Sequence, residues 1–594
     1  MKDYKRLVSS WISGLEIVKA AGLNEADVYA LIEKPKDAAH GEYAFPCFRL
    51  AKALGKAPQA IAAEAAAELK EPSPLCPRAY GPYLNFFIDR AIYCEDIITD
   101  VLSKGARFGG SDIGKGKRML VEFSSPNIAK PFHIGHIRST VQGNALANIL
   151  AFLGYEVSRL NHLGDYGTQF GKLIVAYRRF GSKAEVEAAP IPTLLKYYVE
   201  FHEKAADDPS LDEEARAAFA ALERGEKDEK ALWEWFREES LKEFTAVYDV
   251  MGIKFDSYDG ESFFSDKMDR FTEELEKDGL LLESDGAYIV DLEEYGLGKA
   301  LIKKSDGSTL YITRDIAAAV YRKEHYDFYK NIYVVAAQQD LHFKQWIKIL
   351  ELMGYEWAGD CVHVPFGLVR LADGAMKTRT GNVVFLEDVL SQAVEKTRAI
   401  VEEKGIVTDD IDKTARQIGI GAVVFQELFG NRIKDYVFDW EKVLNFEGET
   451  GPYAQYSFAR AASVLRKAEE MEIDTRPEAL LGSLMARGAE AAPQAAVAPS
   501  PVFAVAASEP VFSLAKLIGE LPDVVAEAAE KYEPSLLTRH ITDISQAFSV
   551  FYHEEPILGD TGDARLVKLA LTAAAKQAIG NGLALLGISA PERM

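Results

Sequence analysis

The feature that most constrains the fold of this chain is a histidine-containing turn between an apolar strand and a helix. Residues 119–123 form an apolar run, and the turn at 133–136 has the sequence His-Ile-Gly-His. A helical pattern with small residues follows from about 137 to 152, and a second strand pattern lies near 156 to 161. Strand, helix and strand in this order predict a βαβ unit, the building block of a doubly wound parallel sheet.

The turn has the chemistry of a phosphate site, because the first N–H groups of a helix and its dipole attract anions. His133 and His136 are three residues apart, so both imidazoles can face one side of the first turn and donate to phosphate oxygens. Gly135 has no Cβ, which lets an adenine ring approach the backbone. On these four residues alone a second interpretation stays open, in which the histidines cap the helix or pack against it.

The composition excludes several classes of protein. No apolar run is long enough to cross a bilayer, and the first residues lack the apolar segment of a secretory signal. The formal net charge of −23 argues against non-specific coating of nucleic acid, although a shaped RNA can still be bound through local contacts. The cysteines lie far apart without a CxxC pair, which argues against a zinc site and suits the reducing cytosol. They are Cys47, Cys76, Cys94 and Cys361.

Two stretches around these strands carry a family resemblance. Residues 122–140, EFSSPNIAKPFHIGHIRST, closely resemble the signature of arginyl-tRNA synthetases. Residues 161–171, NHLGDYGTQFG, resemble it too, and the resemblance continues through nearly the whole chain. It therefore does not depend on one short motif.

The resemblance implies an α/β protein with a Rossmann-like doubly wound parallel-sheet catalytic domain, an α+β amino-terminal added domain and an all-α anticodon-binding domain. We expect the added domain over 1–112, the catalytic domain over 113–408 with a connective insertion at about 177–300, and the helical domain over 409–594. An Ala/Pro-rich stretch at about 489–508 departs from the family pattern, and its prolines bar a continuous helix.

Two more turns from strand to helix are expected near 310–317 and 334–343. Ligands of open α/β sheets bind beyond the carboxyl ends of the strands, so both turns should point into one crevice. A guanidinium needs planar, charge-assisted acceptors. The residues that match the family's arginine-binding positions are Glu122, Asn127, Tyr311, Asp315 and Gln339.

Within that set, we expect Glu122, Asp315 and the Tyr311 hydroxyl to bind the arginine side chain. Asn127 and Gln339 would hold its amino-acid end. The alternative for each residue is structural: Asp315 caps its helix, for example, and Gln339 closes a turn.

Residues 375–382, AMKTRTGN, occupy the place of the KMSKS loop of class I synthetases. The second consensus lysine is replaced by Thr378, and the arginyl family often compensates with a lysine before the histidine turn, here Lys130. Lys377, Arg379 and Lys130 are therefore the candidates for neutralising the triphosphate. The alternative is a solvent-exposed basic turn.

The implied activity is that of an ATP-dependent arginine–tRNA ligase. The arginine carboxylate attacks the α-phosphate of ATP, and a hydroxyl of the terminal adenosine of tRNA(Arg) then takes the arginyl group. Mg²⁺ is expected to accompany ATP, with no dedicated protein cage for a metal, and family members commonly need bound tRNA before they activate arginine. The catalytic candidates are His133, His136, Lys130, Lys377 and Arg379, and those for ATP are Gly135, His133, His136, Met376 and Lys377.

Further residues match tRNA-contacting positions of the family. Tyr83 and Asn85 fall where the D-loop is contacted, and Tyr453 and Tyr456 are aromatic candidates for stacking in the anticodon-binding domain. Met594 falls where family members place a terminal methionine against the anticodon loop. The alternatives are core tyrosines, a turn asparagine and a frayed end. We expect a monomer with no membrane contact.

Two other functions compete with this one. The first is another class I synthetase or a small-molecule adenylyltransferase, which would share the histidine turn. A small adenylyltransferase would not need the long helical carboxyl-terminal region. A cysteinyl-tRNA synthetase would carry a set of zinc ligands. A catalytically inactive relative that binds tRNA is the non-enzymatic alternative. Retention of the histidine turn together with Tyr311, Asp315 and Gln339 argues against it.

Overall fold

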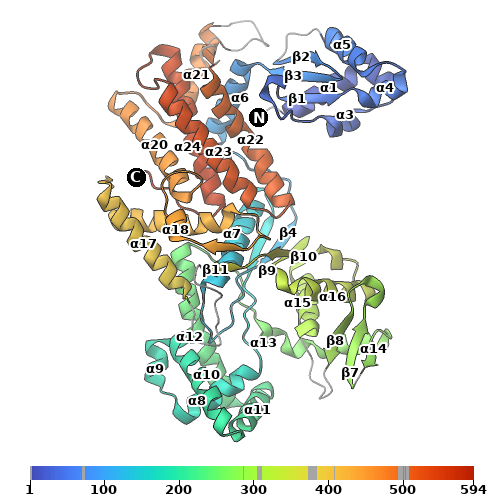
Figure 1. Ribbon diagram of the computed structural model, residues 1–594, viewed down its shortest axis with the longest axis vertical. Coiled ribbons are helices and arrows are strands. Elements are labelled where there is room, and N and C mark those ends of the chain that lie inside the picture. Colours follow the sequence, from blue (N-terminus) through green and yellow to red (C-terminus); the bar gives the residue numbers. More distant parts are fainter. Residues whose placement is uncertain are drawn as a thin grey trace.

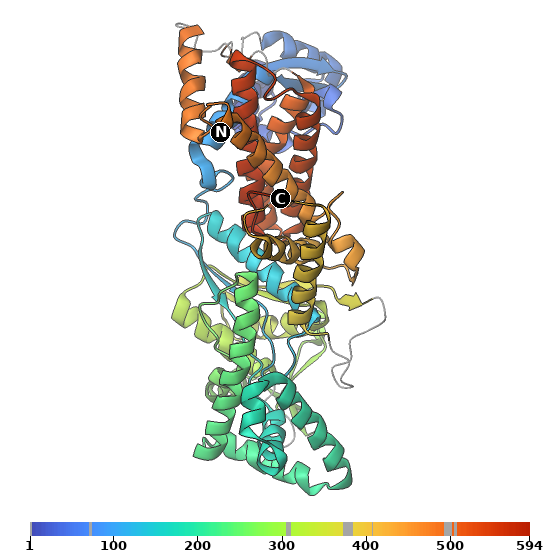
Figure 2. The same ribbon diagram turned by 90° about the vertical axis from the view of Figure 1, so that its left-hand side faces the viewer.

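The computed structural model describes residues 3–69, 74–284, 286–303, 311–371, 384–406, 408–491, 500, 502–503 and 508–594. The molecule is long, with a parallel sheet near its middle, an insertion of helices at one end, and the amino-terminal sheet and carboxyl-terminal helices at the other (Figures 1 and 2). Within the described residues, no helix is both long and apolar enough to cross a membrane.

The central sheet has four parallel strands in the order β10-β9-β4-β5. Helix α7 connects β4 to β5 on one side, whereas β9 pairs with the other side of β4. The strand order therefore reverses between β4 and β9, which is where a doubly wound sheet opens its ligand crevice. The bounds are β4 (Arg118–Glu122), η3 (Ile134–His136), α7 (Ile137–Phe152), β5 (Glu156–Leu160), α15 (Tyr311–Tyr326), β9 (Lys330–Ala336), η6 (Ala337–Gln339), α16 (Asp340–Leu352), η7 (Ala358–Asp360), β10 (Cys361–Phe366) and β11 (Val369–Leu371).

The insertion between β5 and β9 contains a helical part and a small sheet. The sequence indicated the helices, whereas the antiparallel sheet β6-β7-β8 is an addition that the structure provides. The bounds are α8 (Thr168–Phe180), α9 (Lys183–Ala188), α10 (Pro190–Asp207), α11 (Ser210–Glu223), α12 (Lys227–Met251), α13 (Glu261–Phe264), η4 (Ser265–Lys267), α14 (Asp269–Lys277), β6 (Leu282–Ser284), β7 (Ala287–Asp291), η5 (Glu293–Tyr295) and β8 (Lys299–Lys303).

The amino-terminal region folds around an antiparallel sheet in the order β1-β3-β2. Helix α6 leads from it to the central sheet and packs against the carboxyl-terminal helix α22. The bounds are α1 (Tyr4–Gly14), α2 (Glu16–Ala20), α3 (Glu25–Leu31), η1 (Ala38–His40), β1 (Tyr43–Pro46), α4 (Phe48–Leu54), α5 (Pro58–Glu68), β2 (Leu75–Tyr80), β3 (Tyr83–Ile88), α6 (Arg90–Lys104) and η2 (Gly105–Arg107).

The carboxyl-terminal region is helical, as its periodicity predicted, and it contributes one short strand that pairs with β11. Most of the Ala/Pro-rich stretch lies outside the described residues. The bounds are α17 (Leu386–Glu403), α18 (Ile411–Phe429), β12 (Tyr436–Phe438), α19 (Trp440–Val443), α20 (Gly451–Glu470), α21 (Pro477–Ala491), α22 (Glu509–Glu530), α23 (Ser535–Glu554) and α24 (Gly562–Leu585).

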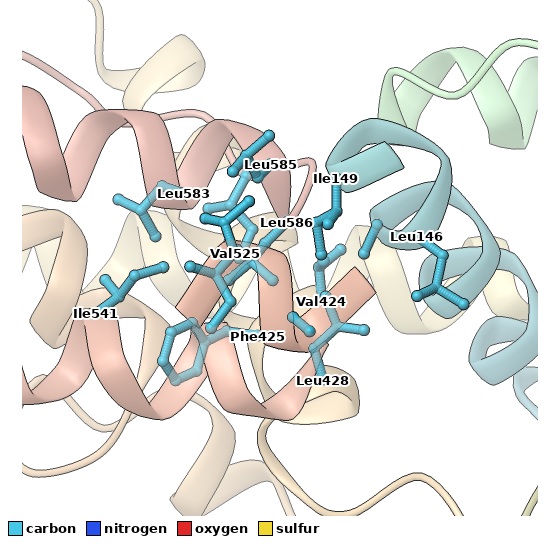
Figure 3. Packing of buried hydrophobic residues seen from close by; sticks show 14 of the residues in the cluster. Leu146, Ile149, Val424, Phe425, Leu428, Val525, Ile541, Leu583, Leu585 and Leu586 are labelled. Carbon is cyan, nitrogen blue, oxygen red and sulfur yellow. The ribbon is translucent and has the colours of Figure 1, made fainter. Parts of the chain in front are cut away.

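Helix α7 joins the central sheet to the helical region. Leu146 and Ile149 of α7 face Val424 and Leu428 of α18, next to the packed ends of α22, α23 and α24 (Figure 3). Each such side chain contributes roughly 1.5–3 kcal/mol when fully buried. The helix that starts at the histidine turn therefore packs against the central sheet on one side and against the helical region on the other.

A buried arginine adds polar contacts to this junction. Arg138 in the first turn of α7 donates to the carbonyl oxygens of Gly367 (3.1 Å) and Lys434 (2.7 Å). It also lies 3.6 Å from the buried Glu427 carboxylate of α18. These bonds fix α7 relative to β11, β12 and α18.

One local expectation is wrong. The sequence indicated a strand that runs into a helix over residues 310–317, but Tyr311 already begins helix α15, and Leu310 lies outside the described residues. Tyr, Ile and Thr favour strands because their side chains suit a pleated, half-buried surface, and tertiary context overrides that preference. Here Ile312 and Thr313 are buried by the first turn of a helix that packs inward.

Candidate active site at the switch point of the parallel sheet

His133 and His136 lie against each other where α7 begins. Their ring centroids are 4.0 Å apart, and His133 Nδ1 accepts a hydrogen bond of 3.0 Å from the Gly135 N–H. Burial lowers the pKa of His136 to about 3, with a smaller contribution from His133, and burial also lowers the pKa of His133. Both imidazoles are therefore neutral at physiological pH. Because Nδ1 of His133 accepts, its proton is on Nε2, where it can be donated to an anion.

The loop between β4 and the histidine turn has a strained backbone. Ser124, Ser125 and Ala129 have φ angles of 70°, 46° and 57°, a region that residues with side chains rarely adopt. The Ser124 N–H donates to Ser139 Oγ (2.9 Å), and the Ala129 N–H donates to Ser240 Oγ (3.0 Å). Residues in such conformations cost about 1–3 kcal/mol each and persist only where surrounding contacts fix them, often at functional sites.

Glu122 ends strand β4 beside the switch point and is almost entirely buried. Its Oε2 lies 2.5 Å from Nη1 of Arg322, a buried residue of α15. Across the neighbouring strand, Tyr333 is the register partner of Glu122. Burial raises the pKa of Tyr333, and the charges of Glu122 and Asp315 raise it further, so both carboxylates lie near this phenol.

Asp315 and Tyr311 lie on the first turns of α15. Asp315 Oδ2 is 2.5 Å from His342 Nε2, so this carboxylate has a partner on α16. Tyr311 is 64% exposed, and the guanidinium carbon of Arg314 lies 5.6 Å from its ring centroid. An acid and a phenol of α15 and the half-buried His342 imidazole of α16 thus lie close to one another.

Asn127 and Gln339 are both exposed, in the loop after β4 and at the end of η6 after β9. Asn127 forms an isolated parallel bridge with Gly164, whose N–H donates to the carbonyl of Pro126 at 3.0 Å. A Cβ at Gly164 would overlap Asn127 Oδ1 and stand 2.9 Å from its Cγ. The loops that follow β4 and β5 therefore touch at the amide that we expect to hold the amino-acid end.

The basic candidates divide into two groups. Lys130 lies in the strained loop and is partly exposed. Met376, Lys377 and Arg379 lie in the segment 372–383, outside the described residues. Strand β11 ends directly before this segment and pairs with β12 near the start of α7.

The two amino-terminal candidates differ in accessibility. Tyr83 is half-buried, and its ring lies 5.6 Å from that of the exposed Phe48 in an edge-to-face arrangement. Asn85 is only 3% exposed, and its Nδ2 donates to the carbonyl oxygen of His40 at 2.6 Å. Tyr83, Phe48 and the exposed Tyr80 opposite Tyr83 form the accessible aromatic surface here. Asn85 instead fixes the loop that contains His40.

Tyr456 and Met594 meet in a cavity of about 320 Å³ between α20, α23 and the last residues of the chain. The Arg460 guanidinium carbon lies 4.6 Å from the ring centroid of Tyr456 and 5.0 Å from that of Tyr552. Tyr453 is half-buried at the start of α20 and does not line this cavity. An aromatic pair around a guanidinium is suited to stacking an unpaired base.

Family models match three successive parts of the chain. Residues 5–88 match the arginyl tRNA synthetase N terminal domain. Residues 97–440 match the catalytic domain of class I (R) tRNA synthetases, and residues 454–594 match the DALR anticodon binding domain. The chain belongs to the arginyl-tRNA synthetase family.

Similar proteins agree over the full length. An arginine–tRNA ligase of Halothermothrix orenii is 52% identical over 96% of this chain and 97% of its own length. One of Clostridioides difficile is 50% identical over all of both chains. The solved arginyl-tRNA synthetase of Thermus thermophilus covers 99% of this chain and all of its own, with a TM-score of 0.78 and 25% identity. The expected class I architecture, with an added amino-terminal domain and a helical anticodon-binding domain, is thus confirmed.

Sequence reasoning missed Glu261 at the arginyl-tRNA synthetase site. Glu261 begins α13, and its carboxylate lies 3.4 Å from Arg314. Burial raises its pKa to about 7, Arg314 opposes this shift, and the nearby Asp315 adds to it. It is a third acid beside Asp315, but it lies in the insertion, where no motif singled it out.

Asp165 of the second signature stretch has a structural task. It is fully buried and accepts hydrogen bonds from Arg237 Nε (3.1 Å) and from the Ser262 backbone N–H (2.8 Å). A Cβ at Gly260 would stand 2.6 Å from this carboxylate. Asp165 therefore holds the insertion, including Glu261, against the loop that follows β5.

Proposed function

We propose that the crevice between β4 and β9 activates L-arginine with ATP, and that the arginyl group is then transferred to tRNA(Arg). The observation that carries this proposal is the convergence of two unlike surfaces at one switch point. The histidine turn at the start of α7 suits phosphate, and the carboxylates beside β4 and α15 suit a guanidinium. Family membership supports the same reaction.

On the phosphate side, His133 and His136 act as neutral donors to ATP. Gly135 leaves space for the adenine, and Met376 and Lys377 complete the ATP contacts. Lys130, Lys377 and Arg379 balance the charge on the triphosphate as pyrophosphate leaves. No side chain becomes covalently attached, so catalysis comes from positioning and electrostatic stabilisation of the α-phosphate.

On the amino-acid side, Asp315, the Tyr311 hydroxyl and Glu261 face the guanidinium. Asn127 and Gln339 hold the amino-acid end, which directs the carboxylate at the α-phosphate. Glu122, which is paired with Arg322, is the third carboxylate on this side of the crevice. We call Glu122, Asp315 and Glu261 the acidic wall. A lysine side chain is disfavoured because an ammonium group cannot make forked contacts.

Mg²⁺ would arrive with ATP. Among the described residues, no group of three or more His, Cys, Asp or Glu side chains is placed to hold a metal ion. Phosphate oxygens and water are the usual ligands of Mg²⁺ at nucleotide sites, and here the ion would supply positive charge to the phosphates.

The tRNA side uses two separate surfaces. Tyr83 contacts the D-loop from the amino-terminal region, with Asn85 holding the loop beside it. Tyr456 and Met594 receive an anticodon base in the cavity around Arg460. Tyr453, at the start of α20 and outside this cavity, offers a further aromatic contact. We further propose that the protein works in the cytoplasm as a monomer; its cysteines are free thiols, which suits that compartment.

The test is ATP–pyrophosphate exchange with each of the twenty amino acids, with and without tRNA(Arg). Exchange that depends on arginine alone is the expected result. Exchange with another amino acid would refute the assignment of arginine as the substrate. If folded protein showed no exchange even with tRNA present, the better explanation would be a catalytically inactive relative that binds RNA.

A further inference from the structure

Arg322 is a buried arginine of α15 that the proposed reaction does not use. Its side chain is 4% exposed, and Nη1 lies 2.5 Å from Glu122 Oε2, whose side chain is 8% exposed. The charge of Glu122 raises the pKa of Arg322 further above its ordinary value, against the effect of burial. This is a close ion pair inside the protein, near the amino-acid side of the crevice.

The guanidinium lies among residues of three neighbouring strands of the sheet and the loops that follow them. It pairs with Glu122 at the end of β4, and its Nη2 lies 3.5 Å from Nδ1 of His162, two residues after β5. Its carbon is 5.6 Å from the ring centroid of Tyr333 in β9. A planar fork of donors can hold such an arrangement, and a compact ammonium cannot.

The pair also sets the charge of the pocket. Glu122 and Asp315 both act on Tyr333, and Glu261 is near Asp315, so three acids share this region. Removing Arg322 would leave Glu122 buried without a partner, which proteins avoid by protonation or rearrangement. A carboxylate accepts several hydrogen bonds, so pairing with Arg322 orients Glu122 without exhausting its capacity.

We propose that Arg322 is a positioning residue for the amino-acid pocket. It holds the Glu122 carboxylate in one orientation, so that the pocket binds arginine through Glu122, Asp315 and Glu261 together. This inference rests on the proposed function and adds to it a residue that touches no substrate atom.

The test compares R322K, R322M, E122Q and the double variant E122Q/R322M by steady-state aminoacylation. For R322K and R322M we expect the KM for arginine to rise about 30-fold or more, as for truncation of one member of a buried charge pair. The KM values for ATP and tRNA should stay within about twofold, because Arg322 contacts neither the histidine turn nor the tRNA surfaces. A merely structural role would lower Tm without this selective change.

The double variant tests whether Arg322 acts through Glu122. If it does, E122Q/R322M has the arginine KM of E122Q alone, because there is no charged carboxylate left to position. Additive losses would overturn the proposal, and so would an unchanged arginine KM in R322K. Isothermal titration with arginine gives the same comparison if R322M proves too unstable for kinetics.

R432K is the matched control. Arg432 is a similarly buried arginine, paired with Glu533 at 2.9 Å in the helical region. It should lower Tm without changing the arginine KM, and an arginine KM raised as much as in R322K would overturn the proposal. Failure of the wild type to charge tRNA with arginine would refute the proposed function itself, whereas a charging wild type with an unaffected R322K refutes this inference alone.

Discussion

The two histidines show how a residue's environment determines its chemical role. An exposed imidazole titrates near physiological pH, but the packing of His133 and His136 against each other and Phe132 keeps both neutral. A neutral imidazole can donate one hydrogen bond to a phosphate. Because it stays neutral, the charge of the site does not change near physiological pH. The turn therefore offers hydrogen-bond donors whose charge does not change with pH. In the proposed reaction, Lys130, Lys377 and Arg379 neutralise the charge of ATP.

Replacing His136 by Ala should lower the rate of arginine activation by roughly 10²–10³-fold, as for removal of one donor to a developing oxyanion. The KM for arginine should change little, because the acidic wall remains. Single-turnover adenylate formation measures the effect. His540→Ala, which removes another buried imidazole that is bonded to the Leu517 carbonyl, is the control and should leave the rate unchanged; a normal rate in His136→Ala would contradict the role.

Arginine binding should strengthen as pH rises through about 7, because burial raises the pKa of Glu261 to about 7 and a guanidinium binds its ionised form. If the bound form is always ionised, the KM for arginine should fall roughly tenfold between pH 6 and pH 8. The same raised pKa contributes stability that is complete below about 4.5, the ordinary value, and is lost as pH rises through about 7.

Glu261→Gln should raise the KM for arginine and remove this pH dependence. Glu229→Gln, at an acid paired with Arg178 in the insertion, should keep it. A pH-independent KM in the wild type, or an unaltered profile in Glu261→Gln, would show that Glu261 does not bind the substrate.

At the scale of residues, the sequence predicted which residues belong to the motifs. It did not predict which side chains form ion pairs with each other. His133, Asn127 and Asp315 lie in recognisable stretches, but the ion pair of Glu122 with Arg322 joins residues 200 positions apart, with no local pattern to reveal it. Glu261 was missed for the same reason. Charge partners depend on tertiary contacts that periodicity does not encode.

At the scale of elements, the site depends on loops that are strained or tightly packed. The loop after β4 has three residues at positive φ, and the loop after β5 touches it at Gly164. Helix α7 is fixed by apolar packing and by Arg138, so the histidine turn cannot shift independently of the sheet. Such pre-organisation means that binding energy is not spent on ordering the site.

Gly164→Ala should raise the KM for arginine by about tenfold or more, because the added Cβ would overlap Asn127 Oδ1 and displace this amide by a few tenths of an ångström or more. Steady-state kinetics and thermal unfolding measure it. Gly482→Ala is the matched control, since a Cβ there meets nothing within 4 Å in helix α21, and it should stabilise by about 0.5–1 kcal/mol. An unchanged arginine KM in Gly164→Ala would show that Asn127 does not hold the substrate.

Long elements were predictable and short ones were not. The helix expected from about 137 to 152 is α7 with those bounds, because small and apolar residues there are buried on nearly every side. The segment 310–317 was expected to run from a strand into a helix, yet a helix already begins at Tyr311. Three or four residues carry too little periodicity to overrule tertiary packing.

At the scale of the whole molecule, the two surfaces that we propose for tRNA contact lie on the amino-terminal region and on the carboxyl-terminal helices. The amino-terminal sheet and the α20–α24 helices are at the same end of the molecule, away from the inserted helices (Figure 1). With a net charge of −23, the protein must bind RNA by local stacking and cationic groups rather than by a basic surface. The cavity lined by Tyr456, Arg460 and Met594 is the group that we propose for this role.

Tyr456→Leu should raise the Kd and KM for tRNA roughly 5–150-fold, the loss expected when one stacked base loses its aromatic partner. The KM values for arginine and ATP should not change, because the cavity lies in the helical region. Filter binding and aminoacylation measure the effect. Tyr295→Leu, at an exposed tyrosine of the insertion, is the control. If both variants lost tRNA affinity equally, the cavity would not be a tRNA contact.

The central claim is tested most directly by aminoacylation of total tRNA with each of the twenty amino acids, comparing the wild type with Asp315→Ala and His136→Ala. The account predicts charging with arginine alone, lost or severely reduced in both variants while their thermal unfolding stays cooperative. Charging with a different amino acid, or full activity in either variant, would contradict it.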